Sequence, residues 1–206
     1  LQGLTVAPVL FALSIPIATR IGRRDGDSTL STIILAAAAT KLVMAYVQFK
    51  LAYGYYAGQV DAEQYSASAK LLAPNFRRFD FTMNMGPLVG TGYTRVITGL
   101  VYAITGTSTL AGFLVFSWFG FVGLVLIARA FKVGIPTGDP RRYLIAVLFL
   151  PSLLYWPSTI GKEAIMILAI GLCAFGVANV FQRRATGVLP AAAGLFLVLM
   201  IRPHVA

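Results

Sequence analysis

Long runs of apolar residues, separated by short polar segments, form the main pattern along this chain. A helix needs roughly 20 apolar residues to cross a bilayer, and several of the runs approach or exceed that length. Backbone polar groups inside hydrocarbon must be bonded within their own segment, so the runs are predicted to be helices. Six candidate spans follow, at residues 4–18, 30–52, 109–131, 141–157, 160–181 and 187–203. The fourth is short, and we expect it to bend at Pro151.

The predicted fold class is all-α, a polytopic transmembrane helical bundle in which residues 1–206 form one transmembrane domain. Residues 53–108 form a long segment between two spans. Within it, residues 62–72 carry apolar side chains at helical spacing, which predicts a helix lying in the membrane interface. Residues 93–105 are apolar but short, and predict a second interfacial or re-entrant helix. The chain ends without a polar tail, so we expect it to be part of a longer polypeptide.

Composition supports a membrane protein. Hydrophobic residues make up 58% of the chain and charged residues 12%, against about 25% charged residues in soluble domains. The net charge of +10 is compatible with nucleic-acid binding, but the basic residues form short clusters between apolar runs. We therefore expect no nucleic-acid partner. The single cysteine, Cys173, excludes an internal disulfide and a multi-cysteine metal site.

Basic clusters follow the first and fifth spans and bracket the loop after the third. If spans alternate in direction, all of these clusters lie on one side of the membrane. Lysine and arginine accumulate in cytoplasmic loops, so this side is predicted to be cytoplasmic. The extracytoplasmic face then receives residues 53–108, 157–163 and 202–206.

The chain has only seven acidic residues. Those in the cytoplasmic loops are explained as solvated charges, whereas Asp61 and Glu163 each have two interpretations. Asp61 is either a helix cap that forms a capping box with Gln64 or a reactive carboxylate. Glu163 is either a carboxylate favoured by the dipole at a helix N-terminus or a second site residue.

Two further polar residues stand out. Lys41 lies near the middle of the second span, where a charge is costly and usually faces the bundle interior. We therefore predict a buried polar role for Lys41. His204 follows the helix-breaking Pro203 and is either incidental or part of a substrate site.

A series of short motifs resembles the GT-C-fold glycosyltransferases, polytopic enzymes that use polyprenyl-phosphate sugars. The resemblance covers roughly residues 30–181, with an acidic motif in the first outer loop and a carboxylate at the start of a later helix. Unlike the family pattern, the second outer loop carries Lys162-Glu163 in place of an aspartate, and a helix precedes the family's first. The motifs are Val60-Asp-Ala-Glu-Gln-Tyr65, Met85-Gly-Pro-Leu, Ala103-Ile-Thr-Gly-Thr-Ser-Thr-Leu-Ala and Ala128-Arg-Ala-Phe.

The resemblance implies a sugar transferase of the bacterial plasma membrane, with Asp61 and Glu163 as catalytic residues. Its partners would be a membrane lipid, the polyprenyl-phosphate sugar, and a glycan or lipid acceptor. No cofactor is required, although a divalent metal ion would be compatible with the chemistry. The candidate substrate-binding residues on the same face are Glu63, Tyr65, Arg77, Arg78, Lys162, Arg202 and His204.

Two other functions remain open. One is a polysaccharide polymerase or ligase acting on polyprenyl-linked glycans, which would depend more on outer-face arginines than on Asp61. The other is a non-catalytic subunit that packs against membrane-protein partners in a larger complex. A transporter is disfavoured, because the chain has no paired halves with broken helices in matching positions. Replacement of Asp61 by Asn distinguishes a transferase from a non-catalytic subunit.

Overall fold

The computed structural model describes residues 2–82 and 86–203. It is 85% helical, without strands in the described residues, which confirms the all-α prediction. The helices, with short π- and 3₁₀-segments marked η, are α1 (Gln2–Asp25), α2 (Ser28–Lys50), η1 (Leu51–Tyr55), α3 (Asp61–Arg77), η2 (Leu88–Gly92), α4 (Tyr93–Thr105), α5 (Thr109–Gly134), α6 (Pro140–Phe149), α7 (Pro151–Tyr155), η3 (Trp156–Ser158), α8 (Lys162–Phe181), η4 (Ala185–Gly187) and α9 (Val188–Ile201).

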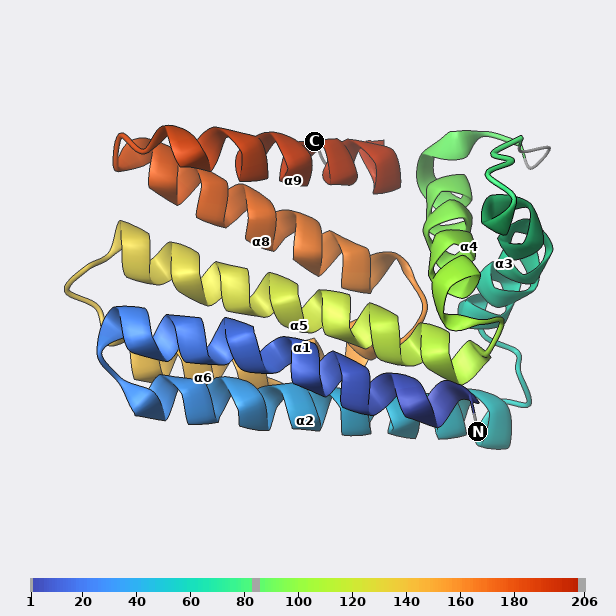
Figure 1. Cartoon of the computed structure of the whole chain (residues 1–206), viewed down its shortest axis with the longest axis horizontal. Helices are drawn as coiled ribbons and strands as arrows, with labels where there is room; N and C mark the ends of the chain where they lie inside the picture. Colours follow the sequence, from blue (N-terminus) through green and yellow to red (C-terminus); the bar gives the residue numbers. More distant parts are fainter. Residues whose placement is uncertain (1, 83–85, 204–206) are drawn as a thin grey trace.

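Helix α5 is the centre of the molecule. It packs against α1, α2, α6 and α8, which run alongside it, while α9 covers the far side of α8 (Figure 1). Phe113, Phe116, Phe121 and Leu124 of α5 are fully buried. A helix that is apolar on all sides is expected at such a central position.

Four helices in the described residues are long and apolar enough to cross a membrane: Thr5–Asp25, Ser28–Tyr55, Thr109–Gly134 and Lys162–Phe181. This agrees with four of the six predicted spans and supports a multi-pass membrane protein. The first helix continues well beyond its predicted end at residue 18, because the basic residues near its C-terminus are compatible with helix.

The span predicted over residues 141–157 is interrupted at Pro151, where the sequence predicts a bend. Helix α6 ends at Phe149, and Leu150 is extended (φ −60°, ψ 123°) because proline at position 151 disfavours the α conformation in the residue before it. The short helix α7 and the turn η3 complete this segment, with Pro157 outside helical geometry. The sixth predicted span contains an apolar helix, Ala185–Ile201, that is shorter than the four above.

Helices α5, α8 and α9 approach one another through glycine. A Cβ atom at Gly123 would lie 2.4 Å from the Ile167 carbonyl oxygen, and one at Gly171 would lie 2.3 Å from the Gly123 carbonyl oxygen. A Cβ atom at Gly176 of α8 would meet the Ala191 backbone nitrogen of α9 at 2.3 Å. Close backbone approach through small residues is typical of helices in membranes.

The connections 26–27, 135–139 and 182–187 lie at one end of the bundle, which we call the basic end (Figure 1). Asp27 caps α2 by accepting a hydrogen bond from the Thr29 backbone nitrogen, and pairs with Arg141 at 2.5 Å. The Arg141 hydrogen bond is the largest cause that lowers the pKa of Asp27. Asp25 pairs with Arg129. These carboxylates are therefore structural rather than merely solvated.

Helices α3 and α4 lie across the opposite end of the bundle, side by side (Figure 1). The predicted helix over 62–72 is present as the longer α3, and α4 has the predicted bounds of 93–105. The Ser66 and Tyr102 hydroxyls are 2.8 Å apart in their interface. Met85, from the motif preceding α4, and His204 lie outside the described residues.

Candidate functional site

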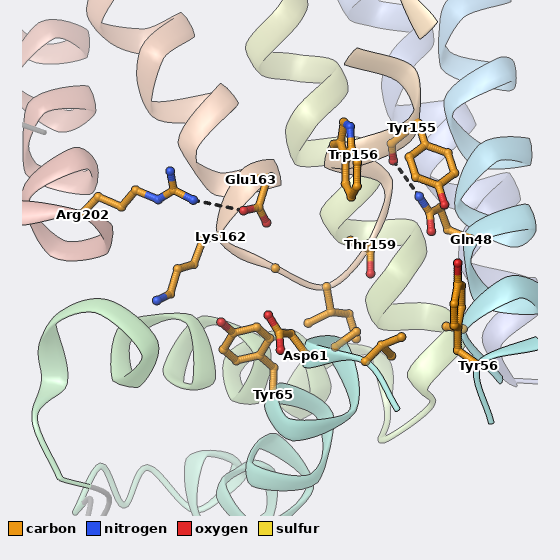
Figure 2. A pocket seen from close by; sticks show the side chains of 15 residues that line it. Gln48, Tyr56, Asp61, Tyr65, Tyr155, Trp156, Thr159, Lys162, Glu163 and Arg202 are labelled. Atoms are coloured by element: carbon orange, nitrogen blue, oxygen red, sulfur yellow. Dashed lines mark hydrogen bonds and ion pairs between the residues drawn. The ribbon is translucent and has the colours of Figure 1, made fainter. Parts of the chain in front are cut away.

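A cavity of about 670 Å³ lies at the end of the bundle opposite the basic end. Helices α2, α3 and α8, the turn after α7 and the residue that follows α9 enclose it (Figure 2). Such a volume is typical of small-molecule sites, which lie between about 300 and 1,000 Å³. The polar and aromatic side chains that line it are Gln48, Tyr56, Asp61, Tyr65, Tyr155, Trp156, Thr159, Lys162, Glu163 and Arg202.

Asp61 and Glu163 line the same cavity although they are far apart in the sequence. Asp61 lies at the start of α3, and Glu163 lies in the first turn of α8, on the other side of the cavity (Figure 2). Two carboxylates that were predicted to lie on the same face therefore line one cavity. This arrangement follows because α2 leads into α3 at the end of the bundle where α8 begins.

The capping interpretation of Asp61 is wrong. Val60 occupies the cap position of α3, and no side chain caps this helix by a hydrogen bond. Asp61 is exposed and forms no hydrogen bond or ion pair with another residue that the structure describes. A carboxylate without a structural partner at the wall of a cavity is available to a substrate.

Glu163 is paired instead. Arg202 donates a hydrogen bond to it at 3.2 Å, and each side chain keeps more than 40% of its surface exposed. A pair this exposed contributes little to stability. The neighbouring Lys162 donates a hydrogen bond to the Thr91 hydroxyl at 3.0 Å. This wall of the cavity therefore presents two cations near one carboxylate.

The phenol of Tyr65 lies beside Asp61, with Glu163 across the cavity, and is itself buried. Burial, then Asp61 and then Glu163 raise the pKa of Tyr65, against the opposing effects of Thr91 and Arg95. The cause is electrostatic, since a phenolate would be poorly solvated and repelled by both carboxylates. Tyr65 is thus a neutral hydroxyl able to donate a hydrogen bond into the cavity.

Three predicted site residues do not line the cavity. Glu63 accepts a hydrogen bond from the Tyr53 hydroxyl, on another side of α3. Arg77 donates to the backbone oxygens of Ala103 and Tyr102, at 3.0 and 2.8 Å, and so satisfies the C-terminal end of α4. Arg78 follows α3 and is exposed. The expectation that these three residues share one site with Asp61 is corrected accordingly.

The predicted burial of Lys41 is confirmed, with 1% of the residue exposed. Its Nζ donates to the Leu153 and Leu154 carbonyl oxygens, at 2.9 and 3.4 Å, and lies 3.1 Å from the Ser158 hydroxyl. These groups belong to the broken segment α7–η3, whose last carbonyls have no helical partner. Two turns further along α2, Gln48 donates to the Tyr155 carbonyl oxygen at 3.1 Å. Helix α2 thus holds the turn that leads to Lys162.

We expect Lys41→Met to loosen this turn without unfolding the bundle. Loss of the donor leaves the Leu153 carbonyl oxygen without its partner. The cost of about 1–3 kcal/mol corresponds to roughly five- to 150-fold more frequent local opening. Hydrogen-exchange mass spectrometry of residues 151–161 measures it. Lys50→Met is the matched control, because Lys50 is exposed and lies over the Tyr46 ring. Equal exchange in both variants contradicts a role for Lys41 in this turn.

Several cavity residues were missed by sequence reasoning. Tyr56, Trp156 and Thr159 lie in turns, where no periodic pattern marks a side chain for a site. Gln48 had a detectable signal, because it follows Lys41 by two turns on the same face of an apolar helix. Arg95 is a further residue near the site, because its charge opposes the burial that raises the pKa of Tyr65. Its buried Nε has no hydrogen-bond partner among the described residues.

The donor set does not form a protein-built metal site. The described residues contain no group of three or more histidine, cysteine, aspartate or glutamate side chains able to share an ion. Asp61 and Glu163 are on different walls, and Glu163 already has Arg202 as its counter-ion. The charge complementarity of this site therefore comes from lysine and arginine.

Comparison of the chain with protein-family models, curated proteins and solved structures gives no match. The functional argument consequently rests on the geometry and chemistry of the cavity.

Proposed function

We propose that this chain is a membrane glycosyltransferase of the GT-C type, which transfers a sugar from a polyprenyl-phosphate donor to an acceptor of the cell envelope. One observation carries the proposal. Asp61, a carboxylate without a partner among the residues that the structure describes, faces a cavity whose other wall bears Lys162 and Arg202. The transfer requires a general base for the acceptor hydroxyl and positive charge near the leaving phosphate. The two walls of the cavity carry residues of these two kinds.

In the proposed reaction, the acceptor hydroxyl oxygen bonds to the anomeric carbon of the donor sugar while the bond from that carbon to the phosphate oxygen breaks. Asp61 receives the hydroxyl proton as general base. The electron pair of the broken bond remains on the phosphate, whose developing charge Lys162 and Arg202 stabilise. The role of Glu163 is to hold Arg202, with which it is paired.

The donor's lipid character suits the position of the cavity. With the basic end in the cytoplasm of a bacterium, the cavity faces the extracytoplasmic side of the plasma membrane. Helices α3 and α4 then lie in the interface as a roof over the bundle, beside the hydrocarbon that holds the polyprenyl chain. In this arrangement Asp61 reacts at the membrane surface, where an acceptor is accessible.

Topology is testable by cysteine labelling in a Cys173→Ala background. We expect a membrane-impermeant thiol reagent added from outside to modify cysteine at position 58, beside the cavity, and not at position 134, at the basic end. The reason is the accumulation of positive charge at one end of the bundle. Permeabilised cells provide the control, because both positions should then react. Modification of position 134 in intact cells would reverse the orientation and place the cavity in the cytoplasm.

The direct test is transfer by the purified full chain in proteoliposomes, using radiolabelled polyprenyl-phosphate sugars and an envelope extract as acceptor. Transfer that depends on the chain and on an intact Asp61 supports the proposal. A polymerase or ligase is the second candidate, and the observation in its favour is that Arg202 faces the cavity. That function predicts loss of activity in Arg202→Gln and little change in Asp61→Asn.

A further inference from the structure

The cavity has two chemically different ends (Figure 2). The charged end is formed by Asp61, Tyr65, Lys162, Glu163 and Arg202. The opposite end, which we call the aromatic end, is formed by Gln48, Tyr56, Tyr155, Trp156 and Thr159. The proposed reaction uses only the charged end.

Exposed aromatic rings at the aromatic end are held in defined positions. Trp156 is 63% exposed and Tyr56 is 51% exposed, yet the Trp156 ring packs edge-on against Tyr155, with centroids 5.2 Å apart. Gln48 donates a hydrogen bond to the Tyr155 carbonyl oxygen, and Pro157, which follows Trp156, is buried. The backbone on both sides of Trp156 is therefore held in place, while one face of its ring remains exposed.

A membrane-anchoring role does not account for this arrangement. Tyrosine and tryptophan at a membrane surface need an apolar ring in lipid and one polar atom in water. Here the rings line a cavity together with an amide, from Gln48, and a hydroxyl, from Thr159. Aromatic faces combined with a few directed polar groups are characteristic of ligand sites.

Carbohydrate matches this combination. A sugar ring presents a face of C–H groups, which packs on the electron-rich face of an aromatic ring, and a rim of hydroxyls, which amide and hydroxyl side chains bind. A second lipid tail would find too many polar groups here. A phosphate would find no cation among the described residues of this end.

We infer that the aromatic end is the acceptor site and that the acceptor is a glycan rather than a lipid. This inference rests on the proposed function, because it assigns the donor phosphate to the charged end. Asp61 then lies where an acceptor sugar bound on Trp156 and Tyr56 reaches toward the donor. The elongated site also explains why the cavity extends beyond the charged residues.

Intrinsic fluorescence tests the inference directly, since Trp118 and Trp156 are the two tryptophans of the chain. In the full chain carrying Trp118→Phe, only Trp156 emits. We expect maltohexaose, mannohexaose or galactohexaose to shift its emission to shorter wavelength in a saturable manner, and Tyr56→Ala to weaken the apparent affinity by about fivefold. Asp80→Asn should change this affinity by less than about twofold, because Asp80 is exposed beyond the end of α3 and does not line the cavity.

The matched control is Trp156→Phe, in which only Trp118 emits. Trp118 is bonded to Ser14 of α1, away from the cavity lining, and should not respond to the sugars. Calorimetric titration of the unsubstituted chain and of Trp156→Ala with the same sugars gives a second measurement that does not depend on the Trp118 substitution. Absence of binding by all three oligosaccharides, or an equal response from Trp118, overturns the inference.

The outcomes also separate this inference from the proposed function. If the chain transfers sugar to an envelope acceptor but binds no oligosaccharide at Trp156, the glycan-site inference is wrong and the proposed transferase function stands. If the chain binds oligosaccharide but transfers no sugar from polyprenyl phosphate, the cavity binds carbohydrate and the proposed transferase function is wrong. Binding that survives Trp156→Ala unchanged places the sugar elsewhere and contradicts the inference.

Discussion

Asp61→Asn is expected to lower the rate of sugar transfer by roughly 10²- to 10⁴-fold, the contribution typical of a general base. Asparagine preserves the size of the side chain but cannot accept the acceptor proton. Because Asp61 has no structural partner among the described residues, the variant should fold normally. Initial rates in proteoliposomes, measured at saturating donor, determine the effect.

Asp80→Asn is the matched control for Asp61→Asn. Asp80 follows α3, is exposed, and accepts hydrogen bonds from Thr82 within its own turn. It does not line the cavity, so transfer should be unchanged. If Asp61→Asn has full activity while Arg202→Gln has none, the polymerase or ligase hypothesis is favoured. If neither substitution alters the phenotype of cells that depend on the chain, a non-catalytic subunit is favoured.

Gly171→Ala is expected to destabilise the bundle by about 3 kcal/mol, at the upper end of the range for overpacking. The added methyl group would lie 2.3 Å from the Gly123 carbonyl oxygen. This neighbour is backbone in the central helix α5, so it cannot rotate away, and α5 and α8 must separate. Unfolding in mixed micelles, titrated with a denaturing detergent, measures the change in free energy.

Gly134→Ala is the control for Gly171→Ala, because a methyl group at Gly134 would meet nothing within 4 Å. Gly134 is the last residue of α5 and has a backbone conformation open to alanine. Alanine there should be neutral or stabilising by about 0.4–1 kcal/mol through the unfolded state. Similar losses of stability in both variants would show that glycine packing between α5 and α8 does not hold the helices together.

The fold class and several elements could be predicted from local sequence. Apolar runs and the bilayer's requirement for internal hydrogen bonding determine the long helices, and glycines and turn residues delimit α4 at residues 93–105. The cost of a charge in hydrocarbon predicts the burial of Lys41. Pro151 predicted the bend between α6 and α7, because proline disfavours the α conformation in the residue before it. The hydrophobic pattern alone did not predict it, because the apolar run continues through Leu150.

The site was only partly predictable, since the side of a helix that a residue occupies depends on neighbours distant in the sequence. The sequence by itself determined which residues carry charge, and it placed Asp61 and Glu163 at the same end of the bundle. Only the tertiary structure separated Asp61, which faces the cavity, from Glu63, which turns to Tyr53. It also assigned Arg77 to the carbonyls of α4, and Arg202 to Glu163. Hydrophobicity determines where helices form, whereas the rotation and packing of those helices determine which polar side chains meet.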